Sequence, residues 1–234
     1  MKMYIIRHGQ TPWNARKCLQ GRSDVDLNEN GIYLAELTGK ALRDVTFDMA
    51  FTSPLIRAKH TAQCILAGRE VPIIEDERLI EISMYAFRIS SLPLKSTDGA
   101  VSMIEDERLI EISFGIYEGC CYAEENRQVP QQWIENFFHA PQDYVAAPGG
   151  ESLDDVEKRT RDFMEDICSR KELQDKTILV STHGCALRGL LNSIRESNRE
   201  DYWHGGVSKN CAVSIVTCNR GEKPVLVEEN HIYY

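Results

Sequence analysis

Residues 3–9 read Met-Tyr-Ile-Ile-Arg-His-Gly, and residues 178–184 read Ile-Leu-Val-Ser-Thr-His-Gly. Each stretch is a short apolar run that ends in a histidine followed by a glycine. Such runs are typical of buried parallel strands, and open parallel sheets bind their ligands at the carboxyl ends of the strands. The two stretches therefore predict that His8 and His183 meet at one edge of a sheet, as in an enzyme active site.

Strands and helices are expected to alternate along the rest of the chain. Strands are predicted at residues 3–6, 49–52, 71–74, 177–181, 211–217 and 225–229. Helices are predicted to follow residue 53 and to cover residues 31–43, 131–138, 152–170 and 186–195. This alternation is typical of a three-layer α/β/α sandwich with a mostly parallel sheet, here predicted as a single domain over residues 1–234.

Local signals mark some of these helices. Ser53 is expected to be the N-cap of the helix that follows it, with a proline in the first turn. Ser152 is expected to cap a later helix, and Asp155 completes a capping box. The aromatic residues of 131–138 recur at helical spacing, so they are expected to belong to the core rather than to a ligand site.

The composition argues against several classes of function. The formal net charge is −9, so binding to nucleic acid or to an anionic membrane is not expected. No apolar run approaches the roughly 20 residues that span a bilayer. The first strand follows Met1 and Lys2 so closely that no signal peptide is expected before it. A cytoplasmic protein is therefore expected.

The cysteine and histidine patterns favour neither disulfides nor metal ligands. None of the eight cysteines forms a C-x-x-C pair, so free thiols in a reducing compartment are expected. The six histidines show no H-x-H or H-E-x-x-H spacing, so no metal or other cofactor is expected.

A perfect direct repeat interrupts the pattern. Residues 74–83 read Ile-Glu-Asp-Glu-Arg-Leu-Ile-Glu-Ile-Ser, and residues 104–113 repeat them without a change. Two copies are too few for a solenoid, so we interpret the repeat as a segmental duplication inside one domain. One copy is expected to be native to the fold, and the other to belong to an insertion at about residues 76–105.

Five ordered motifs resemble those of a known family. They are RHGQTPWN with the residues that follow it to 31, SPLIRAKHTA at 53–62, LIEISFGIYEG at 109–119, PGGES at 148–152, and STHG at 181–184. Together they cover nearly the whole chain and resemble the histidine phosphatase superfamily, which includes cofactor-dependent phosphoglycerate mutases. The resemblance implies a phosphoglycerate mutase-like fold. The duplicated block has no place in the family pattern.

The resemblance also implies roles for particular residues. His8 inherits the role of the nucleophile that becomes a phosphohistidine, and Glu111 that of the acid that protonates the leaving alkoxide. His183 is expected to stabilise charge on the transferring oxygens. Arg7 and Arg57 are expected to grip the phosphate with fork-shaped, charged donors. Neutral contacts to the substrate are expected from Asn14, Gln20, Gly21 and Gly184.

Three functions are compatible with these motifs. The favoured one is a phosphatase that hydrolyses a small phosphate monoester. The second is a phosphoglycerate mutase, but family mutases carry an extended, arginine-bearing insertion after the acid motif, and here a short stretch with Arg127 as its sole arginine leads to Trp133. The third is a non-catalytic relative that binds a phosphorylated ligand or a protein partner. A homodimer is left open.

The repeat leaves two candidates for the acid, because Glu81 and Glu111 occupy equivalent places in identical decapeptides. Glu111 is followed by residues 114–119, whose glycines permit tight turns. Glu81 is followed by residues 84–88, which are bulkier and contain no glycine. We therefore expect Glu111 to be the acid, with the opposite threading of the chain as the alternative.

Overall fold

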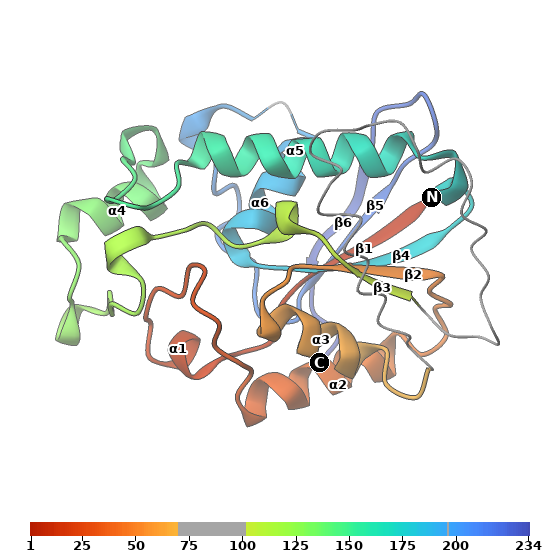
Figure 1. The fold of residues 1–234 in the computed structure, drawn as a ribbon, viewed down its shortest axis with the longest axis horizontal. Coiled ribbons are helices and arrows are strands. Elements are labelled where there is room, and N and C mark those ends of the chain that lie inside the picture. The colour runs from red at the N-terminus through yellow and green to blue at the C-terminus, as the bar shows by residue number, and fades with distance from the viewer. Residues whose placement is uncertain (70–101, 196) are drawn as a thin grey trace.

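The computed structural model describes residues 1–69, 102–195 and 197–234, and within them six strands form one sheet (Figure 1). They are β1 (Lys2–Arg7), β2 (Met49–Thr52), β3 (Ser102–Glu105), β4 (Thr177–Thr182), β5 (Val213–Thr217) and β6 (Val225–His231). Their order in the sheet is β3-β2-β4-β1-β5-β6. Only β5 among them runs against the others. The predicted mostly parallel sheet is confirmed.

Helices cover both faces of this sheet (Figure 1). One face carries α5 (Leu153–Ser169) and α6 (Gly184–Asn192), and the other carries α2 (Glu29–Ala41) and α3 (Ile56–Ile65). The alternating side chains of β1 divide between the two layers: Met3 and Ile5 pack on the α5 and α6 side, whereas Tyr4 and Ile6 pack on the other. The three-layer sandwich is therefore confirmed.

The helix signals were read correctly at one serine and wrongly at the other. Ser152 caps α5, and Asp155 completes the capping box. At α3 the N-cap is Leu55, which makes no side-chain cap. The Ser53 hydroxyl lies two residues too early, where it accepts a bond from the Leu55 N–H and contacts the ring of His183. The expected N-cap at Ser53 is thus wrong.

Two small helices lie beyond the carboxyl ends of the central strands (Figure 1). They are α1 (Pro12–Ala15) and α4 (Gln131–His139). In α4, Ile134 and Phe137 are buried in an apolar cluster, as predicted. Phe137 and Phe138 also line a cavity, so the expectation that this segment takes no part in a ligand site is wrong. None of the helices in the described ranges is both long enough and apolar enough to cross a membrane.

The second copy of the repeat supplies part of the sheet. Residues 104 and 105 form the second half of β3, which pairs in parallel with β2. Residues 102–105, which were expected to end the insertion, are therefore part of the fold. The strand predicted at 71–74 and the first copy of the repeat lie outside the described residues.

One pair of cysteines departs from the expected free thiols. Cys18 and Cys121 form a disulfide, and the other six cysteines are free. The two bonded residues are 103 positions apart in sequence but face each other across an isolated antiparallel bridge. Their spacing along the chain therefore gave no sign of the bond, and the expectation of free thiols is wrong here.

Candidate active site

The two histidines predicted to meet lie side by side. β1 and β4 are neighbours, and Arg7 pairs in register with Thr182, so the next residue of each strand emerges at the same edge. The ring centroids of His8 and His183 are 5.1 Å apart. Both side chains are buried, at 2% and 0% exposure.

The hydrogen bond of His8 fixes which of its nitrogens is free. Nδ1 lies 2.7 Å from the carbonyl oxygen of Gly9. Because a carbonyl oxygen can only accept, Nδ1 carries the proton, and Nε2 keeps its lone pair in the neutral ring. Burial lowers the pKa of His8 well below its usual range, and the charges of Arg57 and Arg7 lower it further. His8 is therefore a neutral imidazole with an available Nε2.

His183 is held at both ring nitrogens. Nε of Arg57 donates to its Nδ1 at 3.2 Å, and its Nε2 lies 2.7 Å from Ser53 Oγ. Burial lowers the pKa of His183 well below its usual range, with Arg57 and His8 adding to the effect. Because Nδ1 accepts from Arg57, the proton of the neutral His183 ring lies on Nε2, which donates to Ser53 Oγ. The Ser53 hydroxyl can also donate, so it would remain a partner of Nε2 if the ring proton moved to Nδ1.

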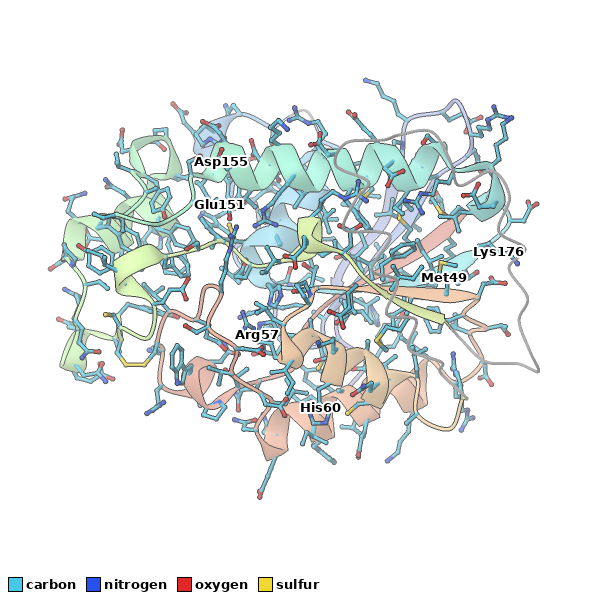
Figure 2. All side chains as sticks on the ribbon, in the orientation of Figure 1. Met49, Arg57, His60, Glu151, Asp155 and Lys176 are labelled. Atoms are coloured by element: carbon cyan, nitrogen blue, oxygen red, sulfur yellow. A yellow bond between two sulfur atoms is a disulfide. The ribbon has the colours of Figure 1, made fainter. Side chains whose placement is uncertain are left out.

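Arg57 is a fully buried cation at the start of α3 (Figure 2). Its terminal nitrogens donate to the carbonyl oxygens of Ser23 and Gly21, each at 2.7 Å. Burial lowers the pKa of Arg57 to about 10, against the opposing effect of Glu111, so the group stays charged at neutral pH.

Arg7 is the second cation of the site. Its NH1 donates to the carbonyl of Ser208, while its buried Nε has no hydrogen-bond partner among the described residues. A buried donor without an acceptor costs free energy. An anion bound in the site would supply the acceptor that this guanidinium lacks.

Glu111 lies at the N-terminus of α6. Its Oε1 accepts from the backbone N–H groups of Cys185 and Ala186, both at 3.1 Å, and from that of Ile112 at 3.0 Å. Free N–H groups at a helix N-terminus favour a negative charge. This side chain lines the same cavity as Arg7 and His8. The structure therefore brings the predicted acid to the two histidines, and Glu81 lies outside the described residues.

The four predicted substrate-binding residues also line this cavity. The amide oxygens of Asn14 and Gln20 accept from Thr11, so their NH₂ groups are the parts suited to an anion. Gly21 has a φ of +52°, and a Cβ there would collide with the carboxylate of Glu118. Gly184 packs tightly as well, since a Cβ would come within 3.0 Å of Val207.

Several residues that hold the site were missed by sequence reasoning. Glu151 pairs with Arg159 at 2.8 Å, and Arg159 donates to the carbonyl oxygens of Arg108 and Ile110. Glu151 lies just before α5 (Figure 2) and Arg159 lies within it, and together they fix the chain that leads into Glu111. The PGGES motif that ends in Ser152 contains Glu151, but its spacing in the sequence did not show that Glu151 pairs with Arg159.

The cavity has a polar end and an aromatic wall. Its volume is about 180 Å³, below the roughly 300–1,000 Å³ of pockets for drug-sized ligands. Arg7, Arg57, His8 and Glu111 form the polar end. Most of the remaining lining is apolar or aromatic and consists of Leu19, Phe114, Tyr122, Phe137, Phe138, Trp203 and Val207. A small phosphate ester with an uncharged remainder fits this division.

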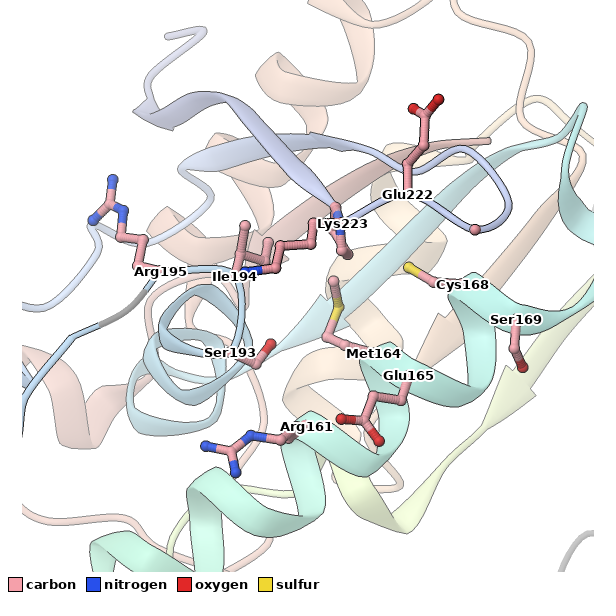
Figure 3. Close-up of a pocket in the computed structure, with 12 residues that line it drawn as sticks. Arg161, Met164, Glu165, Cys168, Ser169, Ser193, Ile194, Arg195, Glu222 and Lys223 are labelled. Carbon is pink, nitrogen blue, oxygen red and sulfur yellow. The ribbon is translucent and has the colours of Figure 1, made fainter.

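A larger hollow of about 470 Å³ lies elsewhere (Figure 3). It is formed by the C-terminal ends of α5 and α6 and by the loop between β5 and β6, including Cys168, Arg195 and Glu222. Helix C-termini disfavour anions, and none of its described lining residues is a histidine. The predicted catalytic residues His8, Arg7, Arg57 and Glu111 line the smaller cavity instead.

Comparison with known proteins identifies the family. The pattern of the histidine phosphatase superfamily (branch 1) matches residues 3–92 and 92–231. The chain belongs to this superfamily. The join between the two matches falls between the two copies of the duplicated decapeptide.

Two proteins related to this chain by sequence are named as mutases. A 2,3-bisphosphoglycerate-dependent phosphoglycerate mutase of Cytophaga hutchinsonii is 30% identical, over 86% of this chain and 81% of that protein. The protein of the same name from Staphylococcus epidermidis is 32% identical, over 86% and 87%. Members of this superfamily are enzymes, and they include both phosphatases and mutases.

Two solved structures share the fold. Bacillus stearothermophilus YhfR superposes with a TM-score of 0.78 at 27% identity, covering 99% of this chain and 97% of its own. A phosphoserine phosphatase of Entamoeba histolytica, in complex with 3-phosphoglyceric acid, gives a TM-score of 0.70 at 25% identity, covering 97% and 95%.

Proposed function

We propose that the protein is a phosphatase that hydrolyses a small phosphate monoester through a phosphohistidine on His8. One observation carries this proposal. Among the described residues that line the cavity, Arg7 and Arg57 are the only arginines or lysines, and both lie at the polar end beside His8. A single phosphate uses both cations. A substrate with a second anionic group would find no further positive charge in the described part of the cavity.

The first chemical step uses the free nitrogen of His8. Nε2 forms a bond to phosphorus as the bond from phosphorus to the leaving oxygen breaks. Arg7, Arg57 and His183 stabilise the charge that develops on the other phosphoryl oxygens. Glu111, in its acid form, gives a proton to the leaving alkoxide.

The second step releases phosphate. The Glu111 carboxylate now takes a proton from a water molecule, whose oxygen forms a bond to phosphorus as the phosphorus–nitrogen bond breaks. Inorganic phosphate leaves, and His8 returns to its neutral form. The low pKa of His8 makes this nitrogen a suitable group both to attack and to leave.

Phosphoglycerate mutase is the second candidate, because curated mutases are 30–32% identical to this chain. A mutase must hold the carboxylate of phosphoglycerate in addition to its phosphate. One experiment separates the two activities. The purified protein is assayed with an aryl phosphate and with 3-phosphoglycerate, each with and without 2,3-bisphosphoglycerate. Release of phosphate without the bisphosphate supports the phosphatase, and isomerisation that requires the bisphosphate would replace it with the mutase.

A further inference from the structure

Three aromatic rings that line the cavity form a continuous wall. The ring centroids of Tyr122 and Phe138 are 5.6 Å apart, and those of Phe138 and Trp203 are 5.9 Å apart. These separations are typical of aromatic rings in contact. All three side chains line the cavity, so they offer a ring-lined surface to whatever group the phosphate carries. We call this set of three residues the aromatic wall.

The aromatic wall is anchored at both ends. Trp203 is 9% exposed, and its indole N–H donates to the carbonyl of Phe137. The N–H of Tyr122 donates to the carbonyl of Lys17 at 2.9 Å, and the residue before it is bonded through the Cys18–Cys121 disulfide. A subsite built on fixed side chains loses little conformational entropy when a ligand binds.

The wall begins next to the phosphate end of the cavity. Burial raises the pKa of the Tyr122 hydroxyl, and the nearby charge of Arg7 partly opposes this effect. Arg7 is therefore close enough to act on Tyr122 electrostatically. A phosphoryl group at Arg7 would place the attached alcohol against the rings.

We propose that Tyr122, Phe138 and Trp203 form a leaving-group subsite that selects phosphate monoesters of an aromatic alcohol. This inference rests on the proposed phosphatase activity and adds the substrate class. An aromatic group gains ring contacts and leaves water. A carboxylate in the same place would find no cation among the described lining residues beyond Arg7 and Arg57, which the phosphate uses.

Phe138 is the member of the wall to change, because it is only partly buried. Benzyl phosphate and ethyl phosphate both release a primary alcohol, so they differ mainly in the ring. We expect the wild type to have a kcat/KM about tenfold higher for benzyl phosphate, which is the scale of one apolar pocket contact. Phe138→Ala should bring the ratio of kcat/KM for benzyl phosphate to kcat/KM for ethyl phosphate close to one, mainly through a higher KM for benzyl phosphate. Phe138→Leu keeps an apolar side chain, so its preference for benzyl over ethyl phosphate should lie between those of the wild type and of Phe138→Ala.

A gain-of-function variant distinguishes a change in the subsite from general damage to the folded protein. Phe138→Arg places a cation in the wall, so we expect a higher kcat/KM for 3-phosphoglycerate and a lower one for benzyl phosphate. Equal losses on benzyl and ethyl phosphate in all three variants, or a wild type that prefers 3-phosphoglycerate, would overturn the subsite.

Ligands that cannot be hydrolysed separate the subsite from the activity. Benzylphosphonate should bind the wild-type protein more tightly than methylphosphonate in a calorimetric titration. Tighter binding of the benzyl compound without hydrolysis of any ester would support the subsite and overturn the phosphatase. Hydrolysis with equal binding of the two phosphonates would support the phosphatase and overturn the subsite.

Discussion

One backbone contact determines which nitrogen of His8 is free. The Gly9 carbonyl holds the Nδ1 proton, and this leaves Nε2 as the proposed nucleophile. During turnover of a radiolabelled ester we expect an acid-labile, alkali-stable phosphoryl group on His8. His8→Ala should abolish both the label and the turnover, because no other described histidine of the site has a free nitrogen. Label that persists in His8→Ala would move the nucleophile elsewhere, with His183 the first residue to test.

The two buried histidines also make stability depend on pH. Their pKa values are lowered in the native state, so between those values and the ordinary 6.5 the unfolded chain binds more protons than the native one. The contribution of these two histidines to the free energy of unfolding is therefore fully present above about pH 6.5. It falls as the pH drops below 6.5, by up to about 1.4 kcal/mol per pH unit for each histidine. Urea denaturation between pH 7.5 and 5.5 measures this slope.

Variants of two histidines test the source of that slope. His8→Ala should flatten it, because one of the two buried groups is removed. His204→Gln should leave it unchanged, because the His204 side chain is 55% exposed. A slope that does not change in His8→Ala would show that other groups cause it.

The choice between the two acids is also decided at single residues. Glu111 lies at the N-terminus of α6 beside Arg7 and His8. We expect Glu111→Gln to lower kcat by roughly 10²–10⁴-fold, most strongly for esters with poor leaving groups. Glu81→Gln, the matched change in the first copy of the repeat, should remain near wild type. If Glu81→Gln is the damaging change, the chain is threaded the other way.

At the scale of elements, the sequence predicted what depends on local pattern. The continuous apolar runs before His8 and His183 are typical of buried strands, and the capping box of Ser152 and Asp155 is a purely local signal. Both were read correctly. Ser53 was misread, because its hydroxyl bonds to His183, 130 positions away. The sequence could not show such a distant partner. It also could not show that Arg159 donates to the backbone carbonyl of Ile110, the residue before Glu111.

The Cys18–Cys121 disulfide joins two segments that surround the cavity. Cys18 lines the cavity itself, and Tyr122 follows Cys121. We expect a reductant to lower the melting temperature, in keeping with the roughly 2–4 kcal/mol that a disulfide contributes, and to raise KM by loosening Tyr122. Thermal denaturation with and without dithiothreitol measures the first effect, and steady-state kinetics the second.

The controls for the disulfide are two cysteine variants. Cys18→Ser should melt at a lower temperature and no longer respond to reductant. Cys64→Ser removes a free thiol and should respond as the wild type does. A wild-type melting temperature that reductant does not change would show that this bond contributes nothing to stability.

At the scale of the whole molecule, crossovers make the site from distant parts of the chain. β1 and β4 are adjacent although 169 residues of chain lie between Arg7 and the start of β4 at Thr177, and α3 and α6 begin at the same edge of the sheet. Strand alternation predicts this edge, since the ends of parallel strands converge there. The position of the duplicated segment was not predictable, because identical copies give the same local pattern.

The repeat allows one copy to be deleted without changing any of the residues on either side of the join. Excising residues 76–105 joins Glu75 to Asp106, and excising 84–113 yields the same chain, because the two decapeptides are identical. In the shortened protein, residues 72–75 (Pro-Ile-Ile-Glu) replace β3, which reads Ser-Met-Ile-Glu. Ile73 would take the buried place of Met103. Proline would stand at the first residue of an edge strand, where it is tolerated.

We therefore expect the shortened protein to fold and to hydrolyse the same esters, with kcat/KM within a few-fold of the full chain. Its stability should be equal or higher, because closing a shorter loop costs less entropy. Circular dichroism, thermal denaturation and an aryl phosphate assay measure these properties. The shortened protein carrying Glu111→Gln is the matched control, which should fold but be nearly inactive. A shortened protein that fails to fold would show that the duplicated segment is part of the core, whereas a folded but inactive one would show that residues 76–105 serve the site.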